Sequence, residues 1–280
     1  MTFPRTVVAG VSLPRLIIGS NWIFGWSHQG KAMDTYIEER HSTTEATLGI
    51  LKAFLEYGID AWMGPFSSHT PALDKIKAIQ DKIGRKLILI DTPVLNMDDT
   101  AEARREAEGI IKTSAEIGST FCLIHHASCE QLVNKNKQTM DRLPDYTDMI
   151  RSAGIIPGLS AHMPEIIQYA DQNGYDVETY IQIFNCLGFL MQVEIESVIK
   201  IIHAAKKPVM TIKPLASGRT TPYVGLTFNW NVLREQDMVA VGCISEHEVH
   251  EDVEISLAAL ERRLPKMDAR ASPAKQVVIR

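Results

Sequence analysis

Short apolar runs alternate with longer segments of helical periodicity along most of the chain. Eight of these runs are short enough for strands, and they cover residues 16–19, 59–63, 86–90, 120–124, 154–159, 180–184, 208–212 and 238–242. They are apolar at nearly every position rather than at every second one. This pattern predicts parallel strands that are covered on both faces.

The segments between these runs repeat apolar residues at helical spacing. They predict helices at residues 43–56, 71–83, 101–117, 146–153, 164–173, 193–205 and 248–263. Eight strands that alternate with helices favour a closed (β/α)₈ TIM barrel over an open sheet. Ahead of the first barrel strand, we expect residues 6–11 to pair with residues 15–19 as a short N-terminal β-hairpin.

Length and composition fit one soluble domain. The chain has 280 residues, of which 45% are hydrophobic and 22% charged, and this is the size of a single barrel. We therefore expect one domain over residues 1–280, with a polar C-terminal tail at 264–280. The four cysteines form no C-x-x-C pair, so we expect buried, reduced thiols, as in cytoplasmic proteins.

The charge pattern excludes several classes of partner. The net charge is −5, and no block of Lys and Arg exceeds two residues, so neither nucleic acid nor an anionic membrane is an expected partner. No apolar run reaches the ~18 residues of a membrane span, and the first ten residues lack the pattern of a signal peptide. The expected partner is a small-molecule substrate, and self-association stays open.

Residues 21–42 form an unusually long connection after the first predicted strand. They include two Trp, one Phe, one Tyr and two His, and in a barrel such a connection lies at the catalytic face. Either these side chains form a wall or lid over a substrate, or the connection is packed by its own aromatic residues. Both interpretations are open.

Polar side chains follow the strands at the ends that meet on one face of a barrel. They are Asn21, Asp60, Asp91, His125, His162, Gln182, Asn185 and Lys213. We expect Asp60, His125, His162 and Lys213 to be catalytic groups, because titratable side chains that converge shift one another's pKa values. Substrate contacts are expected from Asn21, Trp22, Gln182, Asn185 and Arg219.

Three of these residues suggest a divalent metal. Asp91, His125 and His162 end three successive strands, and two imidazoles with one carboxylate suit Mn, Zn or Mg. The alternative is that these groups are hydrogen-bonded in a water-filled barrel mouth.

Two basic residues also have alternative roles. Lys213 can act as a base, form a Schiff base or hold a carboxylate, or it can pair with Asp60 or Asp91. Arg219 follows the seventh strand, where barrels often bind phosphate, or it is a solvated loop residue. We expect His28, His41 and His69 to be surface residues.

The chain resembles the aldo-keto reductase superfamily in a series of segments between residues 11 and 260. The opening V-S-L-P-R-L-I-I-G-S-N resembles the family's hairpin and first strand, and E-Y-G-I-D-A-W resembles the run that ends in its catalytic Asp. G-L-S-A-H-M-P-E, Q-I-F-N-C-L, T-I-K-P-L-A-S-G-R and V-G-C-I-S-E-H-E resemble the regions of its last four strands. The resemblance implies a barrel of the aldo-keto reductase type.

The family's catalytic tetrad is only partly present. The resemblance matches its Asp with Asp60 and its His with His125 or His126, and the choice between these histidines is open. Pro65 and Phe66 stand where the proton-donating Tyr is expected, and Asp91 stands where the Lys is expected. Hydride transfer by the family mechanism is therefore disfavoured.

The expected contacts to an NAD(P) cofactor are also incomplete. The resemblance assigns Ser160 and Gln182 to the nicotinamide carboxamide, whereas Ile212 replaces the aromatic residue that stacks on the ring. Glu246 and Glu248 stand where the family places cations for the 2′-phosphate of NADP. Carboxylates there would repel that dianion, which disfavours NADP.

Three functions are compatible with these residues. The first is acid–base proton transfer on a small polar carbonyl compound, such as a sugar or sugar acid, by an isomerase, epimerase or lyase, with or without a metal. The second is a divergent NAD(P)H-dependent oxidoreductase, and the third is a non-catalytic ligand-binding relative. The converging polar groups favour the first.

Overall fold

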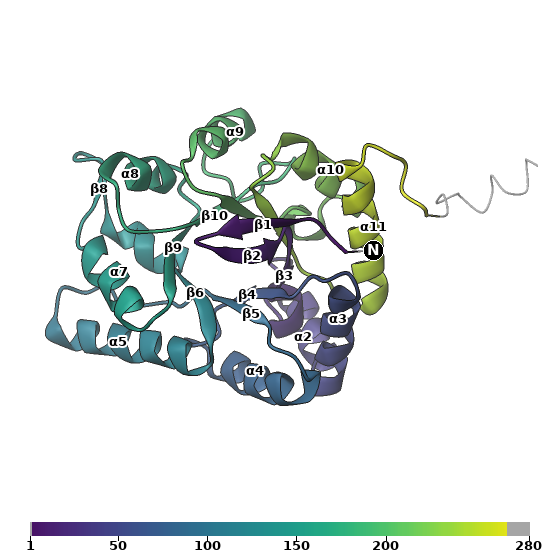
Figure 1. The fold of residues 1–280 in the computed structure, drawn as a ribbon, viewed down its shortest axis with the longest axis horizontal. Helices are drawn as coiled ribbons and strands as arrows, with labels where there is room; N and C mark the ends of the chain where they lie inside the picture. Colours follow the sequence, from purple (N-terminus) through teal and green to yellow (C-terminus); the bar gives the residue numbers. More distant parts are fainter. Residues whose placement is uncertain (1, 268–280) are drawn as a thin grey trace, which may run out of the picture.

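A computed structural model of the protein describes residues 2–267, and its centre is a closed barrel of eight parallel strands (Figure 1). The strands are β3 (Leu16–Gly19), β4 (Ala61–Gly64), β5 (Ile88–Asp91), β6 (Ser119–Ile124), β9 (Ile156–Ala161), β10 (Tyr180–Ile183), β11 (Val209–Ile212) and β12 (Met238–Val241). They close in chain order, because β12 pairs with β3. All eight predicted strands are confirmed, with small shifts at their ends.

Helices connect the barrel strands and surround them. They are α3 (Thr44–Glu56), α4 (Thr70–Ile83), α5 (Ala101–Glu116), α7 (Leu143–Ser152), α8 (Glu165–Asn173), α9 (Ile195–Ala204), α10 (Pro222–Val232) and α11 (Glu246–Leu260). Short elements complete the connections: α1 (Asn21–Phe24), α2 (Lys31–Arg40), α6 (His126–Cys129), and the small hairpin of β7 (Val133–Asn134) and β8 (Thr139–Met140). The predicted TIM barrel is confirmed. Of the predicted C-terminal tail, residues 268–280 lie outside the described part of the chain.

Besides the one-turn helices α1 and α6, two longer helices were not predicted from the sequence. In α10, Leu226 and Trp230 are buried, but Tyr223 and Val224 are about half exposed, so the helix has no polar face to reveal its periodicity. By contrast, α2 has no apolar face that could reveal its periodicity, because Ile37 is its only buried residue. None of the helices that the structure describes is long and apolar enough to cross a membrane.

Alternate side chains of each barrel strand belong to two separate cores. Ile17, Met63, Ile90, Leu123 and Ile181 pack inside the barrel. Their neighbours along the strands point outward and pack against the helices in the larger core. This alternation follows from the two-residue period of a strand, and it decides which residues at the strand ends face the barrel mouth.

An antiparallel hairpin covers the N-terminal end of the barrel (Figure 1). It consists of β1 (Arg5–Val8) and β2 (Val11–Pro14), and Val8 and Leu13 pack into the interior core. The predicted hairpin is present, but its second strand was predicted wrongly at residues 15–19. Those residues lie in the barrel instead, because β3 is hydrogen-bonded to β4 and β12.

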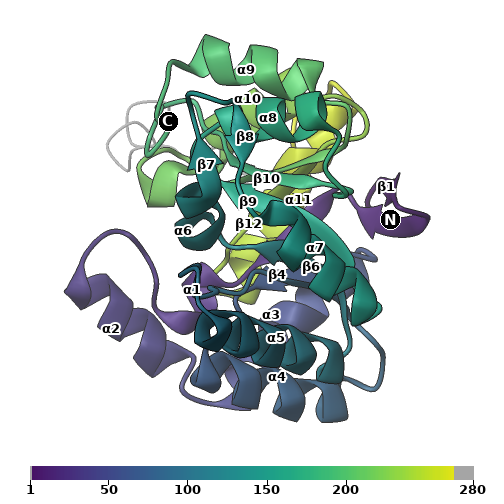
Figure 2. The same ribbon diagram turned by 90° about the vertical axis from the view of Figure 1, so that its left-hand side faces the viewer.

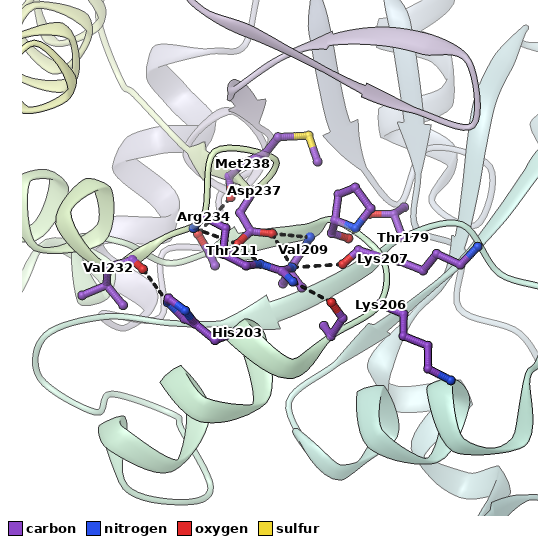
Figure 3. A network of polar contacts seen from close by, with 12 residues as sticks. Thr179, His203, Lys206, Lys207, Val209, Thr211, Val232, Arg234, Asp237 and Met238 are labelled. Atoms are coloured by element: carbon purple, nitrogen blue, oxygen red, sulfur yellow. Dashed lines mark hydrogen bonds and ion pairs between the residues drawn. The ribbon is translucent and has the colours of Figure 1, made fainter.

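An ion-pair network fixes the same end of strands β11 and β12 (Figure 3). Asp237 is fully buried, accepts hydrogen bonds from the Arg234 side chain, and accepts one from the backbone N–H of Val209 at the start of β11. Arg234 also donates to the carbonyls of Ala205 and Lys207. These bonds set the position of β11. They thereby also position Lys213, which follows the C-terminal end of this strand.

The hairpin plug gives the first testable prediction. Leu13→Ala removes a fully buried side chain from the barrel interior, and a Leu→Ala cavity in a core costs about 2–5 kcal/mol of unfolding free energy. Urea unfolding followed by Trp fluorescence measures this loss.

Val7→Ala is the matched control on the same hairpin. Val7 is 60% exposed, so its truncation is expected to cost no more than about 0.5 kcal/mol. Equal effects of the two substitutions would contradict the assignment of the hairpin as a packed plug.

Candidate functional site

A cavity of about 700 Å³ opens at the C-terminal ends of the barrel strands, opposite the hairpin. In Figure 2 the hairpin strand β1 lies on one side of the barrel and α2 projects on the other. The cavity floor is apolar, with Met63, Ile181 and Ile212 rising from the barrel interior. The polar groups around this floor come from seven of the eight strands and from the connections that follow them.

Three imidazoles form one stack on the β6 and β9 side of the cavity. His125 follows β6, His126 is the first residue of α6, and His162 follows β9. The ring centroids of His125 and His126 are 4.2 Å apart, and those of His126 and His162 are 3.6 Å apart with nearly parallel planes. Both histidines between which the sequence could not choose therefore belong to the site.

These imidazoles are neutral at physiological pH. Burial, reinforced by repulsion from His126 and Lys213, lowers the pKa of His125 to about 4 and that of His162 to about 3. Burial also lowers the pKa of His126. The Nδ1 atom of His125 accepts a hydrogen bond from the N–H of Ala127, which leaves its Nε2 to carry the proton.

Lys213 is the only Lys or Arg among the described residues that line the cavity. It follows β11, and its backbone has a φ of 60°, a left-handed conformation that non-glycine residues rarely adopt outside functional sites. Burial lowers the pKa of its ammonium group to about 8. Lys213 forms no ion pair with any carboxylate of residues 2–267, so the predicted pairing with Asp60 or Asp91 is wrong.

The long connection after β3 reaches across the cavity to Lys213. Its His28 lies with Nε2 3.0 Å from Lys213 Nζ and 3.4 Å from Asn21 Nδ2. Burial and the charge of Lys213 lower the pKa of His28, so the neutral imidazole accepts a hydrogen bond from the ammonium group. We expected His28 to be a mere surface residue. It is exposed on its outer side but also lines the cavity.

Two residues from which substrate contacts were expected lie at the start of this connection. Asn21 and Trp22 both line the cavity. Trp22 packs on Gly242, where any Cβ would lie 2.8 Å from its ring. The absence of a side chain at Gly242 therefore keeps the indole of Trp22 in the cavity wall. No short-range sequence signal links two residues so far apart in the chain.

The opposite wall of the cavity is acidic. Going around the barrel, β12 is four strands away from β6 in either direction, so α11, which follows β12, lies across the mouth from the imidazole stack. Glu248, Glu251 and Asp252 of α11 line this wall. Burial raises the pKa of Asp252 to about 7.

Asp60 does not join the other predicted catalytic residues. It lies just before β4 and pairs with Arg5 of the hairpin at 3.0 Å, so it is at the N-terminal end of the barrel. The residues that β4 presents to the cavity are Met63 and Gly64. The expectation from the resemblance is therefore corrected, because Asp60 begins the strand rather than ending it.

Asp91 also points away from the cavity, and the predicted metal set is not assembled. Along β5, Ile90 is in the interior core whereas Leu89 is in the outer core, and Asp91 shares the outward side with Leu89. There it accepts a hydrogen bond from the N–H of Ser67, and burial raises its pKa. No three His, Cys, Asp or Glu side chains within residues 2–267 are arranged to hold a metal ion.

Gln182 and Asn185 are buried outside the cavity. Gln182 lies on the outward side of β10, between Tyr180 and Phe184 of the outer core. Asn185 stabilises the turn that follows β10, because its Oδ1 accepts hydrogen bonds from the N–H groups of Leu187 and Phe189. Neither residue is in reach of a substrate, so both expectations of ligand contact are corrected.

Arg219 supports the mouth without lining it. Its guanidinium donates to the carbonyl oxygen of His28 and lies 4.0 Å from the ring centroid of Phe189. Gln29 is held similarly, because its amide donates to the carbonyl oxygen of Ser217. Arg219 therefore joins the connection after β3 to the loop after β11, rather than binding an anion in the cavity.

The cavity residues do not fit NADP as the resemblance implied. Ser160 does line the cavity, but Gln182, its expected partner at the carboxamide, faces the helices. Among the described residues that line the cavity near the start of α11 there are carboxylates and no cation, and carboxylates repel a 2′-phosphate.

Comparison with solved structures identifies the type of barrel. Two structures from Pseudomonas aeruginosa, provisionally assigned as aldo-keto reductases, superpose with TM-scores of 0.65 and 0.63 at 16% and 14% identity. They cover 91% and 90% of this chain, and 95% and 92% of their own. Aldose reductase from Giardia lamblia gives a TM-score of 0.54 at 12% identity and covers 94% of this chain and 96% of its own. The fold is that of an aldo-keto reductase-type TIM barrel.

At these identities the likeness concerns the fold alone. No protein-family model matches the sequence, and no curated protein is significantly similar to it. TIM barrels of one type carry many activities. The function of this chain must therefore be argued from its own cavity.

The lowered pKa of His162 predicts a dependence of stability on pH. Its pKa is about 3 in the folded chain but ~6.5 when unfolded, so the unfolded chain binds more protons between these values. The contribution of this group to the unfolding free energy has its full value above pH ~6.5 and decreases as the pH falls toward 3. Between pH 7 and pH 5, the unfolding free energy of His162→Gln should therefore decrease by roughly 1 kcal/mol less than that of the wild type, after allowance for solvent screening.

Thermal unfolding of both proteins at pH 7 and pH 5 measures this difference. His247→Gln is the matched control, because His247 is exposed on α11 and does not line the cavity. Its unfolding temperature should match that of the wild type at both pH values. A His162→Gln protein as acid-sensitive as the wild type would show that the imidazole is not buried in neutral form.

Proposed function

We propose that the chain is an enzyme that moves a proton next to the carbonyl group of a small polar compound, such as a sugar or sugar acid. The reaction class is isomerisation, epimerisation or elimination. The observation that carries this proposal is the half-buried Lys213, which lines the cavity beside neutral imidazoles and has no carboxylate partner among the described residues. A buried ammonium group without a counter-charge favours an anionic or electron-rich ligand.

Removal of a proton next to a carbonyl leaves negative charge that the site must stabilise. Lys213 supplies the positive charge for this purpose, on a partly buried side chain that lines the cavity. Because its pKa is about 8, most of the Lys213 side chains are protonated at pH 7.

The imidazoles supply the groups for proton transfer: His162 can accept a proton, and His125, whose Nε2 carries a proton, can donate one. His125 and His162 are neutral in the empty cavity because burial, His126 and Lys213 disfavour their protonation. A bound anion offsets these positive charges and raises both imidazole pKa values toward the range useful for proton transfer. Their proton affinity therefore increases when the substrate occupies the site.

The rest of the cavity suits a compact polar substrate. The cavity has a volume of about 700 Å³, and it is lined by the indoles of Trp22 and Trp26 and by the polar groups of Asn21 and Ser160. Flat aromatic faces beside hydrogen-bonding groups suit the alternating C–H and O–H surface of a polyol. This combination supports a sugar or sugar acid as the substrate class.

Proton exchange in D₂O tests the proposal without a known product. The purified protein is incubated with a panel of aldoses, ketoses and keto acids, and NMR follows deuterium entering the position next to the carbonyl. We expect exchange of at least one compound, and we expect His162→Gln and Lys213→Met each to reduce its rate by about 10²-fold or more.

His247→Gln again serves as the control and should exchange at the wild-type rate. Exchange that persists in both site variants would contradict the assigned roles. Absence of exchange across the panel by the folded wild type would contradict proton transfer itself, and would favour a ligand-binding relative.

A further inference from the structure

The surroundings of Lys213 suit covalent chemistry better than a permanent cation site. Its Nζ has one hydrogen-bond partner among the described residues, His28 Nε2 at 3.0 Å. The floor beside it is formed by Ile181, Ile212 and Leu215. A desolvated amine that lies next to a neutral base, open to a cavity and without a carboxylate, is placed for attack on an electrophile.

We propose that Lys213 captures the carbonyl carbon of its substrate as a Schiff base, with His28 as the proton-transfer partner. This inference rests on the proposed function for its substrate class, a small aldehyde or ketone. It names a covalent intermediate that acid–base chemistry alone does not require.

The step balances with the groups present. His28 Nε2 accepts a proton from the ammonium group, and the free amine of Lys213 adds to the carbonyl carbon. The oxygen then takes up a proton from the nitrogen that has been added, which gives a neutral carbinolamine. The resulting hydroxyl receives the proton held by His28 and leaves as water as the C=N bond forms. The net change converts a lysine ammonium and a carbonyl compound into an iminium ion and water, with no oxidant or reductant.

The iminium ion keeps the positive charge that the proposed function requires. It withdraws electrons from the neighbouring carbon more strongly than a hydrogen-bonded ammonium group. The neutral imidazole of His162 lines the same cavity, and it is the acceptor for the proton that this carbon releases.

The backbone around Lys213 holds it in this position. Lys213, Ala216 and Ser217 all have positive φ, a strained conformation for residues other than glycine. Arg219 and Gln29 join this strained loop to the connection that carries His28. The proximity of His28 to Lys213 thus depends on contacts between two segments about 185 residues apart in sequence.

Reductive trapping tests the inference directly. The full-length protein is incubated at pH 7 with glycolaldehyde, dihydroxyacetone or pyruvate in the presence of sodium cyanoborohydride, which reduces iminium ions to stable amines. Peptide mass spectrometry then locates the adducts. At pH 7 an amine with a pKa of about 8 has roughly a hundredfold more free base than an exposed lysine, so we expect Lys213 to be modified at least tenfold faster than the other lysines.

Variants separate the chemistry from the fold. Lys213→Arg keeps the charge but forms no imine, and it should lose the fast adduct. Lys207→Arg, a surface substitution near the opposite end of β11, should keep it. His28→Gln should slow trapping about tenfold and shift the pH profile of the rate, whereas His247→Gln should change neither.

The outcomes distinguish the imine from the proposed function. Modification of Lys213 no faster than of the surface lysines, with all three compounds and a native circular dichroism spectrum, would overturn the imine. If deuterium exchange still occurred in that case, the proposed proton transfer would be supported and would not require an imine. Fast trapping on Lys213 without exchange of any compound would support carbonyl capture and contradict the proposed proton transfer.

Discussion

The two-residue alternation of side chains along eight parallel strands is the constraint on which this site depends. Closure of the barrel gives every strand one face toward the interior and one toward the helices. A residue after the end of a strand therefore faces the mouth when it continues the interior set, or when the backbone turns there, as at Lys213, which follows the outward set of β11 but has a positive φ. His125 and His162 continue it, and both line the cavity, whereas Asp91 continues the outward set.

The electrostatic character of the cavity follows from which side chains the strand ends and the connections after them bring to the mouth. Imidazoles and one lysine occupy one part of the mouth, and the carboxylates of α11 lie across from the imidazole stack. Burial acts on these groups in opposite directions. It keeps the imidazoles neutral and lowers the pKa of Lys213, but it raises the pKa of Asp252. The site thus holds bases, a cation and a carboxyl group that all titrate away from their usual ranges, as groups at catalytic sites often do.

Part of this site could be predicted from the sequence. His125, His162, Lys213, Asn21 and Trp22 were expected at the mouth and do line the cavity. Gln182 was not predictable in the same way, because its run is apolar on both sides and gives no sign of which residues face inward. Asp60 was misplaced for a different reason, since the resemblance put it among the residues at the mouth although the predicted strand at 59–63 already had it near its start, as the structure has it.

The sequence by itself determined the eight strands, most of the helices and the barrel, because short apolar runs and helical periodicity are local signals that survive without knowledge of contacts. Only the tertiary structure decided which polar residues share the cavity. The pair of His28 and Lys213 joins the connection after the first barrel strand to the end of the seventh. Its formation depends on barrel closure, on strand register and on the path of two loops, and none of these leaves a pattern within a short stretch of sequence.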